Sequence, residues 1–253
     1  MTFCVGLHVR EGLVALADTQ IVRGGEVSSK AKLSLHEHDG RRLFIMTSGL
    51  RSVRDKVVLR LDDVLAGQDE PCRRLHQVVT AFGDELKAVR LEDGPSLEEG
   101  GLRFNLHAII GGQLADDDEP ALFMVYPQGN WVTATDDSPS FIIGRTSYGK
   151  PILDRLLEAD TPLPQAVALA YLAFDATRAS VVDVEFPIDV VVLSGGRLQQ
   201  SRFEPEDLAE AHDFWHRRLR DALDDLPTAW AAPLWPTPDD GAVAGITSAP
   251  SGK

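Results

Sequence analysis

Two blocks of alternating hydrophobic segments, each followed by helical patterns, constrain the fold of this chain more than any other feature. In the first block, apolar and polar residues alternate over residues 2–9, 13–18, 30–37 and 42–48, which is the period of half-buried strands. Short turns containing glycine separate the members of each pair, so the strands are predicted to form antiparallel hairpins. The segment Gly24-Gly25-Glu26 is expected to be a loop between the two hairpins. The chain therefore begins with four predicted strands.

Helical spacing follows these strands. From Leu50 onward apolar residues recur every three or four positions, and a second helix is predicted over residues 71–91. The acidic run 92–101 is expected to be a solvated loop. A second block then continues with strands at 103–112, 120–126, 130–135 and 139–144, helices at 147–159 and 163–178, strands at 187–193 and 197–202, and a helix at 205–225.

This order of elements predicts an α+β fold. Because strands come in runs and helices follow them in pairs, we expect a four-layer αββα sandwich of two antiparallel sheets, with helices on the outer faces. A parallel, doubly wound sheet fits this order poorly. Residues 1–228 are expected to form the sandwich domain, and residues 229–253, which are rich in proline and glycine, an extended or disordered tail.

The charge of the chain excludes several classes of partner. It has 25 Lys and Arg residues against 39 Asp and Glu residues, which gives a net charge of −14. Such a surface repels phosphate backbones and anionic lipids, so we expect neither nucleic acid nor a membrane as a partner. The two cysteines, Cys4 and Cys72, offer no disulfide framework, and no stretch approaches the roughly 18 apolar residues of a membrane span. A cytoplasmic location is therefore expected.

The sequence gives little support for a metal or a cofactor. His212 and His216 lie four residues apart on the last predicted helix and could share a metal ion, but no third ligand is evident. The pairs Gly111-Gly112 and Gly195-Gly196 do not open a helix as a phosphate-binding loop would. We therefore expect no metal and no cofactor.

A hydroxyl residue, Thr2, follows the initiator methionine. If Met1 is removed, Thr2 carries both its Oγ and a free α-amine, which places a nucleophile and a candidate base in one residue. The alternative is that Thr2 is an ordinary second residue in front of a strand. Residues further along the chain decide between these interpretations.

Two charged residues are expected at the same end of the sheet as Thr2. Asp18 ends the second predicted strand, and Lys32 begins the third. A lysine near the Thr2 amine would lower the pKa of that amine from roughly 7.7–8.0, and Asp18 would hold the lysine in place. The alternative is a surface ion pair at a strand end.

A glycine completes this set of candidates. Gly49 closes the fourth predicted strand just before a helix, where its backbone N–H could face the oxyanion of a tetrahedral intermediate. A glycine needed only for the turn from strand to helix is the alternative.

In this order and spacing, Thr2, Asp18, Lys32 and Gly49 resemble the N-terminal half of a proteasome-type β subunit, one of the N-terminal nucleophile hydrolases. Over about residues 2–228 the chain resembles the ancestral β-subunit family of bacteria, Anbu. The matching segments are Thr2-Phe3-Cys4-Val5-Gly6-Leu7, Glu11-Gly12-Leu13-Val14, Ala17-Asp18-Thr19, Ile110-Gly111-Gly112-Gln113, Tyr126-Pro127-Gln128-Gly129-Asn130, Tyr148-Gly149-Lys150-Pro151-Ile152-Leu153-Asp154-Arg155, Phe174-Asp175 and Pro187-Ile188-Asp189.

The resemblance implies a threonine peptidase with assigned roles. Thr2 would be the nucleophile after removal of Met1, and its own amine, directly or through water, the base. Lys32 would tune that amine and Asp18 would orient Lys32, while the N–H of Gly49 would stabilise the oxyanion. Asp175 would correspond to the acidic residue that supports the terminal threonine.

The chain also departs from the proteasome pattern. The usual Gly-Ser-Gly is replaced by Gly144-Arg145-Thr146-Ser147, and no serine lies three residues after Asp175. The hydroxyl that would support the Thr2 amine is therefore open among Thr146, Ser147, Thr177 and Ser180.

The resemblance further implies a self-compartmentalised homo-oligomer, a ring or spiral of dimers, that acts on a peptide or polypeptide. Whether an ATP-dependent unfoldase takes part stays open. Two alternatives remain: a proteasome-like assembly or binding protein with little or no activity, and an amidohydrolase for one specific small amide.

Overall fold

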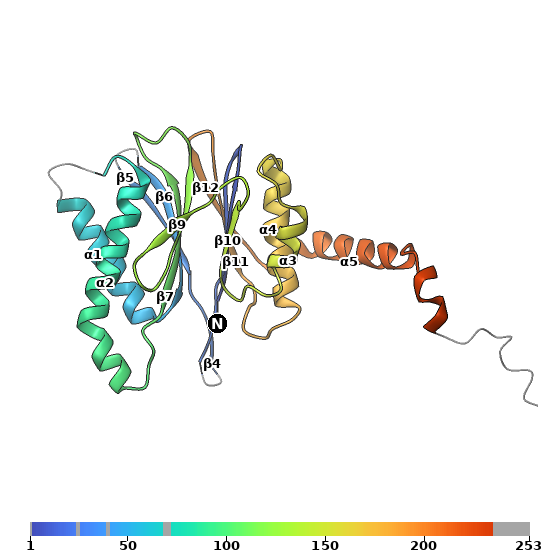
Figure 1. Ribbon diagram of the computed structural model, residues 1–253, viewed down its shortest axis with the longest axis horizontal. Coiled ribbons are helices and arrows are strands. Elements are labelled where there is room, and N and C mark those ends of the chain that lie inside the picture. The colour runs from blue at the N-terminus through green and yellow to red at the C-terminus, as the bar shows by residue number, and fades with distance from the viewer. Residues whose placement is uncertain (1, 24–25, 39–40, 68–71, 235–253) are drawn as a thin grey trace, which may run out of the picture. The chain divides into compact units, whose positions relative to one another are not determined.

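The computed structural model describes residues 2–23, 26–38, 41–67 and 72–234. The chain divides into two compact units, one that ends at Leu208 and one that begins at Ala209. The first unit contains both large sheets and all the predicted site residues, and Figure 1 shows its layers.

The first sheet has five antiparallel strands in the order β10-β1-β2-β11-β12. It places the beginning of the chain inside the sheet, because β1 pairs with β2 on one side and with β10 on the other. Its strands are β1 Phe3–Val9, β2 Gly12–Asp18, β10 Ser140–Gly144, β11 Ile188–Ser194 and β12 Arg197–Phe203.

The second sheet also has five antiparallel strands, in the order β5-β6-β7-β8-β9. β6 ends at Gly49, just before the first helix, so both sheets contribute to the region around Thr2. Its strands are β5 Leu33–His38, β6 Arg41–Gly49, β7 Leu106–Gln113, β8 Ala121–Val125 and β9 Trp131–Thr133.

Pairs of helices cover the outer faces of these sheets (Figure 1). α1 Arg51–Gly67 and α2 Leu75–Glu99 pack on the second sheet, while α3 Lys150–Leu156 and α4 Leu163–Arg178 pack on the first. A third cluster of buried residues, which includes Cys4, Phe44 and Leu122, fills the space between the sheets. The predicted four-layer αββα sandwich is confirmed.

Alternation along β1 explains how one strand serves two layers. Phe3, Val5 and Leu7 face the cluster under α3 and α4, whereas Cys4 faces the cluster between the sheets. Burial of both faces of β1 anchors the residues that follow Thr2, and it fixes the position at which the chain enters the sheet.

The prediction of four initial strands was wrong, because six strands precede α1. The additional pair is a two-stranded hairpin of β3 Gln20–Arg23 and β4 Glu26–Ser29. Glu26, the last residue of the predicted loop, is the first residue of β4, whereas Gly24 and Gly25 lie outside the described residues. The strands of this hairpin pair with each other and belong to neither large sheet, so they lack the long alternating pattern of a core strand.

The acidic run 92–101 was also mispredicted, because α2 continues through most of it and ends at Glu99. Lys56 and Arg60 of α1 form ion pairs with Glu92, and Lys56 also pairs with Asp93. The run therefore lies against a basic strip of the neighbouring helix, which the pattern of α2 alone could not reveal.

The second unit begins with α5 Ala209–Asp224, and a 3-10 helix, Ala229–Leu234, follows it. The predicted helix at 205–225 thus starts as a separate 3-10 turn, Pro205–Leu208, in the first unit. Most of the predicted tail, residues 235–253, lies outside the described residues. Among the helices of the described residues, none is both long and apolar enough to cross a membrane.

Candidate active site

Backbone contacts from two elements hold Thr2 in front of β1. The carbonyl oxygen of Thr2 accepts a hydrogen bond from the Arg145 N–H at 2.9 Å, just after β10 ends. Gly144 has a φ of +91°, and a Cβ at this position would lie 1.8 Å from that carbonyl oxygen. The N–H of Phe3, in the same peptide unit, donates to Oδ1 of Asp18 at 2.7 Å. The peptide unit that follows the Thr2 side chain is therefore fixed from both sides.

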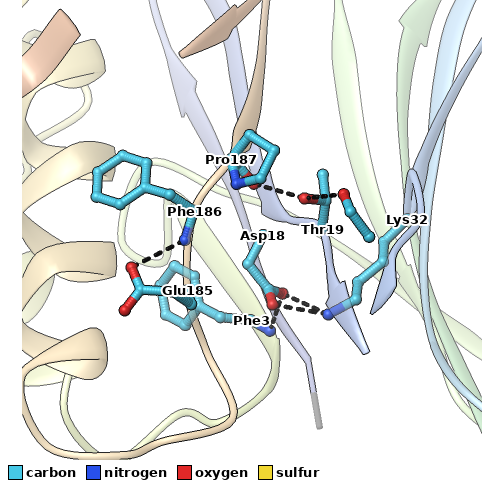
Figure 2. Close-up of polar contacts among 8 residues, drawn as sticks. Phe3, Asp18, Thr19, Lys32, Glu185, Phe186 and Pro187 are labelled. Atoms are coloured by element: carbon cyan, nitrogen blue, oxygen red, sulfur yellow. Dashed lines mark hydrogen bonds and ion pairs between the residues drawn. The ribbon is translucent and has the colours of Figure 1, made fainter. Parts of the chain in front are cut away.

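Asp18 and Lys32 form a buried ion pair beside this point (Figure 2). The Lys32 ammonium donates to both carboxylate oxygens of Asp18, at 2.8 and 2.7 Å. Asp18 is fully buried and Lys32 is 8% exposed. The interpretation of these residues as a surface ion pair is therefore wrong.

Two opposing effects set the protonation of Asp18. Burial, the larger effect, raises the pKa of its carboxyl to about 6, while the Lys32 ammonium and the Phe3 N–H lower it. At neutral pH the carboxylate is thus the main form, and it is held by three hydrogen bonds.

The backbone around Lys32 is fixed as well. Its carbonyl oxygen accepts a hydrogen bond from the Thr47 N–H on β6 at 3.2 Å. Thr19, which is buried, donates its hydroxyl to the Pro187 carbonyl and accepts a hydrogen bond from Ser29 at the end of β4 (Figure 2). The β3–β4 hairpin is thereby tied to the core on the approach to Lys32.

Thr2, Lys32 and Gly49 line one cavity of about 220 Å³. Asp18 lies directly behind Lys32 and does not line the cavity itself. The remaining lining residues are Ile21, Lys30, Ala31, Thr47, Leu50, Arg51 and Arg54. The structure therefore brings together four of the five residues chosen from the sequence.

Gly49 is required at its position for steric reasons. Its φ is +144°, and a Cβ there would lie 2.1 Å from the carbonyl oxygen of Asn105 on the neighbouring chain segment. This steric requirement is enough to explain the glycine without a catalytic role. A catalytic role is compatible with it, because only the backbone N–H of Gly49 would contact an oxyanion.

Asp175 is not among the residues that line the cavity. It is buried on α4, 3.8 Å from the Arg178 guanidinium, and its charge adds to the effect of burial that raises the pKa of Tyr171 to about 12.

The candidate supporting hydroxyls differ in what they bond. The Thr177 hydroxyl donates to the Ala173 carbonyl, and the Ser180 hydroxyl donates to the Ala176 carbonyl. Each acceptor lies on α4, four residues before its donor. Thr146 and Ser147 are exposed and directly follow Arg145, whose N–H contacts Thr2.

Sequence reasoning missed Arg51 and Arg54, which stand in the first turn of α1 at the cavity. A signal was available. The first turn of a helix favours acidic residues because of the helix dipole, and this turn has two arginines and no acid.

The αββα sandwich, with its first strand inside one sheet and a threonine in front of that strand at a cavity, defines the class. It is the fold of the proteasome β subunits and of the wider N-terminal nucleophile hydrolases. Comparison with solved structures narrows this class to a family.

The chain belongs to the Anbu (ancestral β-subunit) family. A mutant of Anbu from Hyphomicrobium sp. strain MC1 is 31% identical with a TM-score of 0.80, and the match covers 90% of this chain and 98% of that one. Anbu from Yersinia bercovieri is 29% identical with a TM-score of 0.79, covering 89% and 97%. A helical assembly of the Anbu complex from Pseudomonas aeruginosa matches at 29% identity and a TM-score of 0.81, covering 89% and 97%. No protein-family model and no curated protein matches the chain.

Proposed function

We propose that this protein is a threonine-type peptidase whose nucleophile is Thr2, exposed by removal of Met1. The observation that supports the proposal most directly is that Thr2, Lys32 and Gly49 line one cavity, with the Asp18 carboxylate buried behind the Lys32 ammonium. Nucleophile, charge and backbone donor are thus within one small volume, as amide cleavage requires.

The chemistry follows from these positions. The Thr2 amine, directly or through a water molecule, takes the proton from Oγ as the oxygen attacks the substrate carbonyl. The Gly49 N–H stabilises the negative oxygen of the tetrahedral intermediate. The protonated amine then gives its proton to the leaving nitrogen, which leaves an ester on Thr2. Water, activated by the same amine, hydrolyses this ester and restores the free hydroxyl.

Lys32 acts in this scheme through its charge. A neighbouring ammonium disfavours a second positive charge, so it lowers the pKa of the Thr2 amine and keeps the amine neutral at working pH. Asp18 is a positioning residue, because it holds the Lys32 ammonium by two hydrogen bonds.

For Asp175 we propose a supporting role. It follows Phe174, which packs against Phe3, and it does not line the cavity, so it would stabilise the position of Thr2 through the packing of α4 on β1. Thr146 and Ser147 are the better candidates for the hydroxyl near the Thr2 amine, since Thr177 and Ser180 donate to helix carbonyls.

The proposal depends on one peptide bond. While Met1 is attached, the nitrogen of Thr2 is part of an amide and cannot act as a base. The small side chain of Thr2 favours removal of the preceding methionine.

The proposed enzyme is a cytoplasmic homo-oligomer, a ring or spiral of dimers. The helical assembly of the P. aeruginosa relative supports assembly, as do Phe214, Leu219 and Leu223, which are exposed on α5. The placement of Cys4 and Cys72 in separate buried clusters fits a reducing compartment.

Treatment of the purified assembly with an epoxyketone, which needs both an N-terminal amine and a hydroxyl, tests the proposal. Intact mass should show a chain that begins at Thr2 and carries one adduct, while Thr2→Ala should carry none and cleave no peptide. A chain that begins at Thr2 but forms no adduct would refute the proposal and favour an assembly or binding role. An adduct together with cleavage of one small amide, but of no peptide, would favour the amidohydrolase.

A further inference from the structure

The cavity next to Thr2 is basic, although the whole chain is acidic. Four of its lining residues are cations, Lys30, Lys32, Arg51 and Arg54, in a protein with a net charge of −14. In the described part of the chain, none of the residues that line the cavity is acidic. A cleft lined by one sign of charge focuses the field and attracts groups of the opposite sign.

Among the described residues, two carboxylates form hydrogen bonds with these four cations. Asp18 pairs with Lys32, and a single carboxylate, Asp55, accepts hydrogen bonds from both Arg51 and Arg54, at 3.2 and 3.0 Å. Lys30 is exposed at the cavity. We name Lys30, Arg51 and Arg54 the basic rim; it has excess positive charge after these pairs are counted.

The two arginines occupy an unfavourable position on α1. They lie three residues apart, so they share one face of the helix, and that face lines the cavity. Both stand in the first turn, where the helix dipole disfavours cations. Their presence there is explained if they bind a negative group that enters the cavity.

The pairs with Asp55 are suited to exchange. Asp55 is 41% exposed and Arg51 49% exposed, and ion pairs in such surroundings are weak. A carboxylate that arrives in the cavity can therefore replace Asp55 as a partner at little cost.

The position of the rim identifies the part of the substrate that it would contact. Arg51 follows Gly49 by two residues, so their Cα atoms are at most about 7.6 Å apart. When the carbonyl of a substrate residue binds at the Gly49 N–H, the side chain of that same residue is thus within reach of Arg51. Ile21, Ala31 and Leu50 supply an apolar wall for the stem of that side chain.

We propose that the basic rim binds the carboxylate of an acidic side chain next to the scissile bond, so that the enzyme cleaves peptides after glutamate or aspartate. This inference rests on the proposed function, whose site it shares. It names a substrate class that the nucleophile and the oxyanion donor do not determine.

The test compares fluorogenic peptide amides that differ only in Glu, Gln or Lys before the scissile bond. Glu and Gln have the same shape, so their ratio of kcat/KM measures charge recognition alone. We expect a preference for Glu of at least about tenfold, the value of one charge-assisted hydrogen bond at the lower end of its range. The double variant Arg51→Gln/Arg54→Gln should bring the ratio close to one, and Arg54→Glu should favour the Lys peptide.

Two further variants control for general effects. Arg60→Gln removes an α1 arginine that pairs with Glu92 and does not line the cavity, so the Glu/Gln ratio should not change. Asp55→Asn removes the competing carboxylate and should raise the ratio about two- to fivefold. A ratio near one in the parent protein, or a preference for Glu that persists in the double arginine variant, overturns the inference.

A binding measurement separates this inference from the proposed function. The assembled Thr2→Ala protein is titrated calorimetrically with the Glu and Gln peptides, which it cannot cleave. If the parent cleaves nothing but Thr2→Ala binds the Glu peptide about tenfold more tightly, and Arg51→Gln/Arg54→Gln abolishes this preference, the proposed peptidase activity is refuted and the basic rim still binds acidic side chains. Cleavage without preference for Glu, or equal binding of both peptides, overturns the role proposed for the basic rim.

Discussion

The ion pair between Asp18 and Lys32 permits a test that separates catalysis from stability. Asp18 is fully buried and Lys32 is 8% exposed, so removal of either partner leaves a charge with almost no access to water. Breaking a buried pair in this way lowers the free energy of unfolding by about 3–5 kcal/mol. We therefore expect a loss of this size for both Lys32→Met and Asp18→Asn.

The double variant Asp18→Asn/Lys32→Met should behave differently in stability and in activity. It replaces the pair with neutral side chains of similar volume, and the amide oxygen introduced at position 18 could still accept the hydrogen bond from the Phe3 N–H. Such replacements restore most of the lost stability. The ammonium that tunes the Thr2 amine is still absent, so kcat/KM should remain at least about 10²-fold below that of the parent in this variant and in Lys32→Met.

The assay combines urea unfolding at one fixed protein concentration with kcat/KM over a range of pH. The matched control is Asp189→Asn/Arg202→Met, because Asp189 is 1% exposed, pairs with Arg202 at 2.8 and 2.9 Å, and does not line the cavity. This control should leave kcat/KM unchanged. Recovery of activity together with stability in the Asp18/Lys32 double variant would show that the pair is only structural, and it would refute the role proposed for Lys32.

Two further predictions concern Gly49 and the titration of Asp18. Gly49→Ala should lower the free energy of unfolding by about 1–3 kcal/mol, and so should the control Gly12→Ala, because Gly12 has nearly the same φ (+147°) and the same 2.1 Å approach of a Cβ to a carbonyl oxygen. Only Gly49→Ala should also reduce kcat/KM in the folded fraction. An equal effect of both variants on kcat/KM would count against the oxyanion role. Burial raises the pKa of Asp18 from roughly 3.9 in the unfolded chain to about 6. The part of the unfolding free energy that depends on protonation of Asp18 is therefore fully present below about pH 4 and is lost as the pH rises through 6. Urea unfolding between pH 4 and 7 should therefore show a more negative slope of unfolding free energy against pH for the parent than for Asp18→Asn, and identical slopes would contradict this assignment.

The sequence alone predicted those parts of the fold that one periodic pattern determines. β1, β2 and α4 were predicted to within one residue at each end, because β1 and β2 alternate clearly and are buried on both faces, and α4 is a long, strongly apolar segment. The meeting of Thr2, Lys32 and Gly49 at one cavity also followed from strand order, since each stands at the end of a core strand.

Other features depend on contacts between elements, which a single pattern does not contain. The β3–β4 hairpin is held by Thr19 and Ser29, and the end of α2 is held by Lys56 and Arg60 of another helix. The position of Asp175 away from the cavity depends on how α4 packs across the sheet. The roles of all five predicted site residues remain predictions, and the variants above test those of Thr2, Asp18, Lys32 and Gly49.

Several departures from local structural rules lie around the cavity that Thr2 lines. A buried ion pair is seldom the most stable solution, because apolar residues of equal volume often serve as well or better. Arginines in the first turn of α1 oppose the helix dipole, and Gly49 adopts a conformation that other residues avoid. Asp18 and Lys32 come from two separate segments of the chain, and Gly49 and the two arginines come from a third, yet all of them lie around the cavity that Thr2 lines. The local backbone conformation explains Gly49, but stability alone favours neither the buried pair nor the two arginines, so their convergence favours chemistry at this cavity over a purely structural role.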